Sequence, residues 1–215
     1  MAITPYGSYT RRGLGLTALA LAASPAFAAG RTRIITMLGD SITAGYGLPS
    51  RDAVPACLET ELNRLGANVR VRPAGVSGDT SAGGLARVDF SVQADTDLCI
   101  VALGGNDLLQ GLDPKTTRGN LDRILAKLQG RHMAVVLAGI KAPPVIGAGY
   151  VRDFDGLYPA LAARHHVALY PNLLDGVMGE RRLLQNDGLH PNAVGAVIIA
   201  RRMAPTILKA LAARR

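Results

Sequence analysis

Five short apolar runs, each followed by a stretch of helical composition, most strongly constrain how this 215-residue chain can fold. The runs are rich in Val, Ile and Leu and are almost continuously apolar, instead of alternating between apolar and polar residues. Strands that are covered on both faces have this pattern, as in a parallel sheet with helices on each side. The predicted strands are residues 33–38, 69–72, 98–103, 134–138 and 167–170.

Helical stretches separate these strands and follow the last of them. They are predicted at residues 54–65, 80–92, 114–129 and 154–164, with a final helix after Pro191. The sequence has no internal repeat and no low-complexity linker, and its length suits one domain with a sizeable core. The alternation of strands and helices therefore predicts a single doubly wound α/β sandwich.

The first 28 residues have the features of an export signal. Arg11 and Arg12 precede an apolar run at 14–23, and the small residues Ala26 and Ala28, two positions apart, suit a signal peptidase. A membrane-spanning helix needs about 20 apolar residues, so a permanent anchor is the less favoured interpretation. We expect cleavage after residue 28 to leave a protein without a membrane anchor.

The pair of arginines also resembles a twin-arginine signal, which would imply export of an already folded protein. The choice between this route and general secretion stays open. In either case we expect residues 29–215 to form the domain and to act in the periplasm or outside the cell.

Basic residues are concentrated at the end of the chain. No acidic residue accompanies them after position 200, and the net charge of the whole chain is +8. Only six aromatic residues follow residue 28 and none is interleaved with these bases, so we expect no nucleic-acid partner. The simplest interpretation is a solvated helix face, and peripheral contact with anionic lipid is the alternative. The basic residues are Arg201, Arg202, Lys209, Arg214 and Arg215.

Both cysteines, Cys57 and Cys99, lie among apolar residues and lack the spacing of a metal or redox site. We expect two free thiols, although an exported protein could join them.

Polar, glycine-rich segments follow the first three predicted strands, at residues 39–42, 76–80 and 104–107. The carboxyl ends of parallel strands meet at one edge of a sheet, and reactive groups gather there. We therefore expect these segments to lie close together.

Ser41 is the best candidate nucleophile among the serines. It follows Gly39 on a tight turn between a strand and a helix, where its hydroxyl can project towards a substrate. The alternative is that Ser41 only caps a helix.

His190 is the candidate general base. Asp187 lies three residues before it, so its carboxylate can accept the Nδ1 proton and leave Nε2 free as a base. A pair of metal ligands is the alternative, but no further ligand cluster accompanies these two residues. The adjacent residues His165 and His166 are expected to bind the last carbonyls of a helix, and His132 is given no chemical role.

An acyl-transfer site also needs donors for the oxyanion of the tetrahedral intermediate. Three are available on the predicted edge: the Ser41 N–H, the Gly78 N–H and the side-chain amide of Asn106. Each is a weak signal alone, because Gly78 could simply form a turn.

Together these segments resemble the SGNH (GDSL-type) hydrolase superfamily. Residues 39–42 match its first block, with Ile42 in place of the usual Leu, and Gly78 matches the second. Residues 104–107 and 187–190 match the third and the last block. The resemblance implies a flavodoxin-like three-layer α/β/α sandwich with a five-stranded parallel sheet.

The same resemblance implies roles for the candidate residues. Ser41 would be the nucleophile, His190 the base and Asp187 the residue that orients it, with Ser41, Gly78 and Asn106 forming the oxyanion hole. Residues 77–85 and 103–112 look like the exported thioesterase I/protease I/lysophospholipase and arylesterase group. The change at Ile42 should matter little, because its side chain is expected to point into the core.

We therefore expect a serine ester hydrolase that acts on short to medium acyl esters and thioesters and needs no metal or other cofactor. Apolar pocket walls are expected at Leu108, Leu109, Leu112 and residues 142–150. An esterase for acetylated cell-wall glycan and a non-catalytic lipid- or glycan-binding protein are the alternatives.

Overall fold

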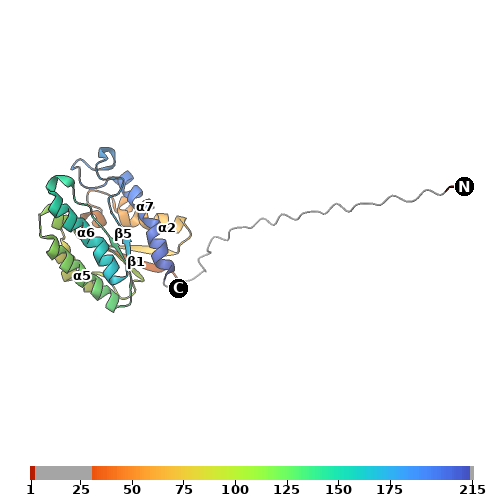
Figure 1. Cartoon of the computed structure of the whole chain (residues 1–215), viewed down its shortest axis with the longest axis horizontal. Coiled ribbons are helices and arrows are strands. Elements are labelled where there is room, and N and C mark those ends of the chain that lie inside the picture. The colour runs from red at the N-terminus through yellow and green to blue at the C-terminus, as the bar shows by residue number, and fades with distance from the viewer. Residues whose placement is uncertain (3–30, 214–215) are drawn as a thin grey trace.

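The computed structural model describes residues 1–2 and 31–213 (Figure 1). The predicted signal segment, with its twin arginines and cleavage site, lies outside the described residues apart from positions 1 and 2. Within the described ranges, no helix is both long enough and apolar enough to cross a membrane.

Five parallel strands form one sheet in the order β2-β1-β3-β4-β5. This is the flavodoxin-like order, with its switch point between β1 and β3. The predicted fold class is therefore confirmed, and β2 extends three residues beyond the predicted end. The strands are β1 (Arg33–Gly39), β2 (Val69–Gly75), β3 (Leu98–Ala102), β4 (Ala134–Ala138) and β5 (Ala168–Tyr170).

Helices cover both faces of the sheet (Figure 1): α2 and α7 pack together on one face, and α3, α5 and α6 on the other. The long helices are α2 (Val54–Arg64), α3 (Ser81–Ser91), α5 (Pro114–Gly130), α6 (Ala148–His165) and α7 (Ala193–Ala212). The short ones are α1 (Ser41–Ala44) and α4 (Gly105–Leu109), with 3-10 turns η1 (Ser50–Asp52), η2 (Pro144–Ile146) and η3 (Arg181–Leu183).

Burial explains the apolar runs. Every residue of the central strands β3 and β4 is buried, as their continuous apolar sequences predict. Burial along the edge strand β2 begins in alternation, with buried Val69 and Val71 on either side of exposed Arg70. The sheet is thus most tightly enclosed at its centre, directly beneath the segments that carry the candidate residues.

Helix α6 begins six residues before the predicted start. Gly149 and Gly156 lower the helical propensity of this segment, so its N-terminal half carries a weak sequence signal. Packing overrides propensity here, because Tyr150 and Val151 in the added turns are partly buried and pack against the core.

The prediction for the His165 ring is wrong. Its nitrogens bind side chains of α5, Gln129 at 2.7 Å and Asp122 at 2.7 Å, instead of the last carbonyls of α6. The ring therefore links α6 to α5. His166 ends α6 in the left-handed conformation, with φ 50°.

The thiols of Cys57 and Cys99 are both free, as predicted. Burial raises the pKa of the Cys99 thiol to about 12, so it stays protonated and inert.

Two of the C-terminal bases are paired within the domain: Arg202 with Asp175, and Arg201 with Glu61 at 4.0 Å. Contact of α7 with anionic lipid stays a prediction.

Candidate active site

Three strand ends bring the polar segments together. Ser41 follows β1, Gly78 follows β2, and Asn106 follows β3 on α4. All three line one pocket with a volume of about 770 Å³, and His190 lines it from the loop before α7. The expected convergence at the carboxyl edge of the sheet is therefore confirmed.

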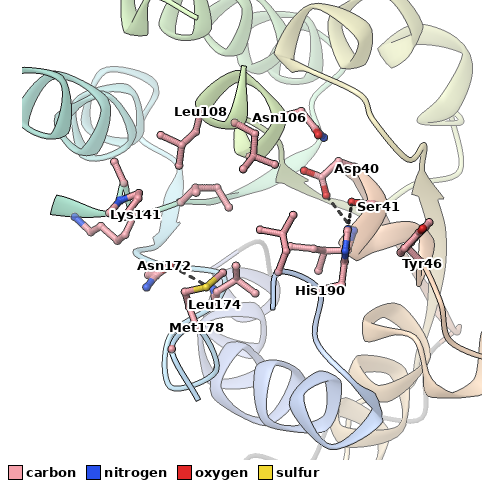
Figure 2. Close-up of a pocket in the computed structure, with 18 of the residues that line it drawn as sticks. Asp40, Ser41, Tyr46, Asn106, Leu108, Lys141, Asn172, Leu174, Met178 and His190 are labelled. Carbon is pink, nitrogen blue, oxygen red and sulfur yellow. Dashed lines mark hydrogen bonds between the residues drawn. The ribbon is translucent and has the colours of Figure 1, made fainter. Parts of the chain in front are cut away.

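The side chains of Ser41, His190 and Asp187 form one hydrogen-bonded chain, although 149 positions separate the first two. Nε2 of His190 lies 2.8 Å from Ser41 Oγ (Figure 2). Nδ1 of the same ring lies 2.7 Å from Asp187 Oδ2. This arrangement lets the imidazole take a proton from the hydroxyl while the carboxylate holds its tautomer.

Backbone geometry keeps Asp187 ionised. Its Oδ1 accepts hydrogen bonds from the N–H groups of Leu189, at 2.9 Å, and His190, at 3.0 Å. These bonds, with the His190 ring, lower the pKa of Asp187 to about 2. The carboxylate is therefore available to the imidazole at every pH at which the protein would be assayed.

The loop that carries His190 is fixed at both ends. Gln185 N–H donates to the His190 carbonyl at 2.8 Å, and the Gln185 side chain donates to the carbonyl of Tyr46 at 2.7 Å. Asn192 then caps α7 by accepting from Gly195 N–H at 3.0 Å. The final helix thus begins just after Pro191, as predicted, and positions the imidazole beside α1.

Capping of α1 is the role of Asp40, not of Ser41. The Asp40 side chain accepts from Ile42 N–H at 3.1 Å, and Ser41 is the first helical residue. The alternative that Ser41 is only a cap is therefore wrong. Burial raises the pKa of Asp40 to about 6, against the opposing effects of this hydrogen bond and of His190.

Gly78 lies in a tight turn that requires a positive backbone φ angle at this residue. The turn is closed by Asp79 N–H donating to the Val76 carbonyl at 3.1 Å, and Gly78 has φ 85°. This region favours glycine, and no atom lies within 4 Å of the place where a Cβ would project. The Gly78 N–H takes no part in closing the turn, so it can face a ligand.

Asn106 reaches the same end of the pocket as Ser41 (Figure 2). Its Nδ2 donates to the Asp79 carbonyl at 2.9 Å. A side-chain amide carries two N–H groups, so the second is free to donate to a ligand. The bond to Asp79 also fixes the rotation of the amide.

Sequence reasoning missed the support beneath Asn106. The fully buried carboxylate of Asp107 accepts from Ser81 N–H at 2.7 Å, from the Ser81 hydroxyl, and from the Thr117 hydroxyl at 3.0 Å. These bonds tie α4 to α3 and α5. Asp107 directly follows Asn106 in the sequence. Its hydrogen-bond donors come from distant segments, so the neighbouring sequence does not identify them.

Sequence reasoning also missed Tyr46, which lies beside the imidazole. The centroids of the Tyr46 and His190 rings are 4.7 Å apart and their planes are inclined by 38° (Figure 2). This contact restricts one side of the histidine ring.

The apolar walls of the pocket are only partly as predicted. The predicted residues that do line it are Leu108, Leu109, Ala142, Pro143, Pro144 and Ile146. Leu112, Val145 and residues 147–150 do not line it, and the Tyr150 hydroxyl donates to the Leu112 carbonyl at 2.8 Å.

The expectation that Ile42 points into the core and not at the substrate is only partly met, because its side chain packs against the core but also lines the pocket. Ile42 is only partly buried, and it lines the pocket next to Ser41. In a one-turn helix that starts at the strand end, the second residue faces the ligand side as well as the core. The Ile-for-Leu change therefore alters the wall of the pocket.

Figure 2 shows Ser41 and His190 at one end of the pocket and Lys141 at the opposite end. Leu174 and Met178, which follow β5, complete the wall and were not predicted. Lys141 pairs with Asp155 at 3.2 Å. The described residues contain no group of three or more His, Cys, Asp or Glu side chains that could hold a metal ion.

Comparison with known proteins extends the match over most of the chain. Residues 37–198 match the GDSL-like Lipase/Acylhydrolase family. The chain is 37% identical to Esterase TesA of Pseudomonas aeruginosa over 174 residues, which cover 80% of this chain and 87% of that protein. It is 35% identical to Thioesterase 1/protease 1/lysophospholipase L1 of Escherichia coli (strain K12), over 83% of this chain and 85% of that protein.

A solved structure agrees with these matches. AlinE4, an SGNH-hydrolase family esterase, is 46% identical and superposes with a TM-score of 0.71, over 84% of this chain and 97% of that one. The family match alone spans every candidate residue from Ser41 to His190.

Proposed function

Because the chain belongs to the GDSL-like lipase/acylhydrolase family, and is thus a carboxylic ester hydrolase, we propose that Ser41, His190 and Asp187 are its catalytic triad. The single observation that carries the proposal is the continuous hydrogen-bonded chain from Ser41 Oγ through the imidazole to Asp187. Its two bonds have lengths suited to proton transfer and to orientation of the ring.

The reaction proceeds in two halves. As Ser41 Oγ attacks the acyl carbonyl carbon, His190 Nε2 takes the hydroxyl proton and the carbonyl electron pair moves to oxygen. Collapse of this intermediate forms the Ser41 ester and expels the alcohol or thiol, which takes the proton from His190. Water then attacks the acyl-enzyme with His190 again as base, and the acid leaves.

The oxyanion of each tetrahedral intermediate is held by the Ser41 and Gly78 N–H groups and the Asn106 amide. Support comes from their shared place in the lining of one pocket and from the hydrogen bond that fixes the rotation of the amide. Donors that are placed before the reaction stabilise developing charge at no cost of reorganisation.

The substrates are short to medium acyl esters and thioesters. The lining beyond Ser41 is formed largely by Leu, Ile, Pro and Met side chains, which suit an alkyl chain. The names of the two relatives, an esterase and a thioesterase/lysophospholipase, agree with this class.

We also propose that residues 1–28 direct export and that the domain acts in the periplasm or outside the cell.

Replacing the nucleophile tests the proposal. Ser41→Ala should leave the folded protein intact and lower turnover of p-nitrophenyl butyrate by roughly 10⁴- to 10⁶-fold, since a triad member is lost. The variant should also lose covalent labelling by a fluorophosphonate. Ser50→Ala, at an exposed serine outside the pocket, is the matched control. Hydrolysis by Ser41→Ala at the wild-type rate would reject the triad.

A further inference from the structure

Arg87 contacts two of the three segments that carry the oxyanion donors. It projects from α3 and its side chain is only 18% exposed. The guanidinium donates to Asp79 Oδ2 at 2.6 Å, to the carbonyls of Ala74 at 2.9 Å and Gly39 at 2.8 Å, and to the Ser91 hydroxyl at 3.0 Å.

Two of these contacts fix the ends of neighbouring strands. Gly39 is the last residue of β1, two positions before Ser41. Ala74 is the penultimate residue of β2 and precedes the turn of Gly78. One planar cation therefore sets the spacing between the segments that carry the first two backbone donors.

The third donor is reached through Asp79. The Asp79 carboxylate binds Arg87, while its backbone carbonyl accepts the hydrogen bond from Asn106 Nδ2 at 2.9 Å. Rotation of Asp79 would move both the acceptor that orients the Asn106 amide and the turn that presents Gly78. Arg87 is thus connected to all three donors without lining the pocket itself.

We propose that Arg87 is a positioning residue that holds the oxyanion hole of this enzyme in register through Gly39, Ala74 and Asp79. The inference rests on the proposed function, because it assumes that the Ser41 and Gly78 N–H groups and the Asn106 amide receive the oxyanion. Donors displaced by a fraction of an ångström stabilise the transition state less, while the bound ester keeps its apolar contacts.

Lysine cannot replace this residue. Its ammonium is a compact charge, whereas the guanidinium is a rigid fork that donates in several fixed directions at once. Arg87→Lys should keep the ion pair with Asp79 and lose the simultaneous bonds to two strand-end carbonyls. A purely electrostatic role would be rescued by this change, and a positioning role would not.

The experiment compares Arg87→Lys, Arg87→Met and Asp79→Asn with the wild-type enzyme. The matched control is Arg72→Met, which breaks an Arg–Asp pair with Asp95, at 2.8 Å, on the same sheet but outside the pocket. Each variant is assayed for kcat and KM on p-nitrophenyl butyrate, for inhibition by a trifluoromethyl ketone, and for its melting temperature.

We expect kcat to fall about 10- to 100-fold in both Arg87 variants, somewhat less than the loss of a whole donor, with KM within about threefold of wild type. Affinity for the ketone, whose adduct carries an oxyanion, should fall by a similar factor. Arg72→Met should keep wild-type kcat and ketone affinity. If Arg87→Met does not fold, Arg87→Lys and Asp79→Asn carry the test.

Folded Arg87→Lys and Asp79→Asn enzymes with kcat and ketone affinity within twofold of wild type would overturn the inference. Variants in which kcat is unchanged and kcat/KM falls only because KM rises would also overturn the inference. A wild-type enzyme that neither hydrolyses the ester nor labels at Ser41 would instead reject the proposed function, so the two failures are distinguishable.

Discussion

Two carboxylates near one imidazole have opposite electrostatic environments. Asp187 is 38% exposed and accepts three hydrogen bonds, so its pKa falls to about 2. Asp40 is 3% exposed, and burial raises its pKa to about 6. The residue that must stay charged is thus stabilised by donors, and the residue that shapes the nucleophile turn carries a desolvation penalty.

This penalty makes Asp40→Asn a test of the buried carboxyl. The folded protein binds the Asp40 proton more tightly than the unfolded chain does, so ionisation destabilises the fold as pH rises from about 4 to 6. Asparagine keeps the capping oxygen without the charge. The variant should match wild type near pH 4 and exceed its stability by up to about 3 kcal/mol at pH 7.

Urea unfolding of both proteins at pH 4, 5, 6 and 7 measures this difference. Comparing them at each pH cancels the titration of the other groups. A stability difference that does not change between pH 4 and pH 7 would show that the Asp40 carboxyl is solvated and not buried.

Sequence reasoning found the residues whose neighbours in the chain mark them. Ser41 follows a glycine at a strand end, and His190 has Asp187 three residues before it. Arg87 and Asp107 carry no such mark, because their partners come from other segments of the chain. A lone arginine or aspartate in a helix reads as an ordinary surface charge until the fold brings those partners together.

At the scale of elements, the close approach of β2 to α1 shapes the nucleophile turn. A Cβ on Gly75 would lie 2.3 Å from the Ala44 nitrogen and 2.6 Å from the Asp40 carbonyl oxygen. Both atoms belong to the backbone, so no side chain can move aside. Only glycine allows the strand end to pack this closely against the turn that presents Ser41.

Gly75→Ala should therefore shift α1 and disturb the Ser41–His190 contact. We expect a loss of about 1–3 kcal/mol in the free energy of unfolding, typical of overpacking. We also expect kcat to fall at least about 10-fold, because misplacement of catalytic groups by about an ångström is costly. Chemical denaturation and ester hydrolysis measure the two effects separately.

Gly119→Ala is the matched control, because Gly119 is exposed on α5 and no atom lies within 4 Å of its added Cβ. It should stabilise the protein by about 0.5–1 kcal/mol and leave kcat unchanged. Equal effects of the two substitutions on kcat would contradict the close-approach argument.

The types of the elements were predictable, because buried parallel strands have a distinctive composition. Some of the residues at which elements begin or end were not predictable. The sequence after residue 72 contains Pro73 and Gly75, which disfavour a strand, yet β2 continues to Gly75 along β1. Its edge position tolerates the proline. The early start of α6 has the same explanation, since tertiary packing overrides weak local propensity.

At the scale of the whole molecule, the strand order separates the proposed nucleophile and oxyanion donors from most of the apolar wall. The three segments with the proposed catalytic and oxyanion groups of Ser41, Gly78 and Asn106 follow β1, β2 and β3, at the switch point of the sheet. The apolar wall comes largely from the segments after β4 and β5. Acyl-chain preference can therefore change through the segments after β4 and the start of the segment after β5, while Ser41, Gly78 and Asn106 keep their places.

Leu174 tests this separation, because it lines the pocket from the segment after β5 and makes none of the described hydrogen bonds to Ser41 or His190 (Figure 2). The wild-type kcat/KM should rise from acetyl to octanoyl p-nitrophenyl esters, since each buried methylene contributes about 0.8 kcal/mol. Leu174→Trp fills the apolar part, so octanoyl hydrolysis should fall roughly 50-fold, the equivalent of about three methylenes, with acetyl hydrolysis within twofold. Leu174→Ala lengthens the pocket and should move the preference to longer chains.

Two outcomes would show that the acyl chain does not lie against this wall. One is a wild-type kcat/KM that is flat from acetyl to decanoyl esters, and the other is an equal fall of the acetyl and octanoyl rates in Leu174→Trp.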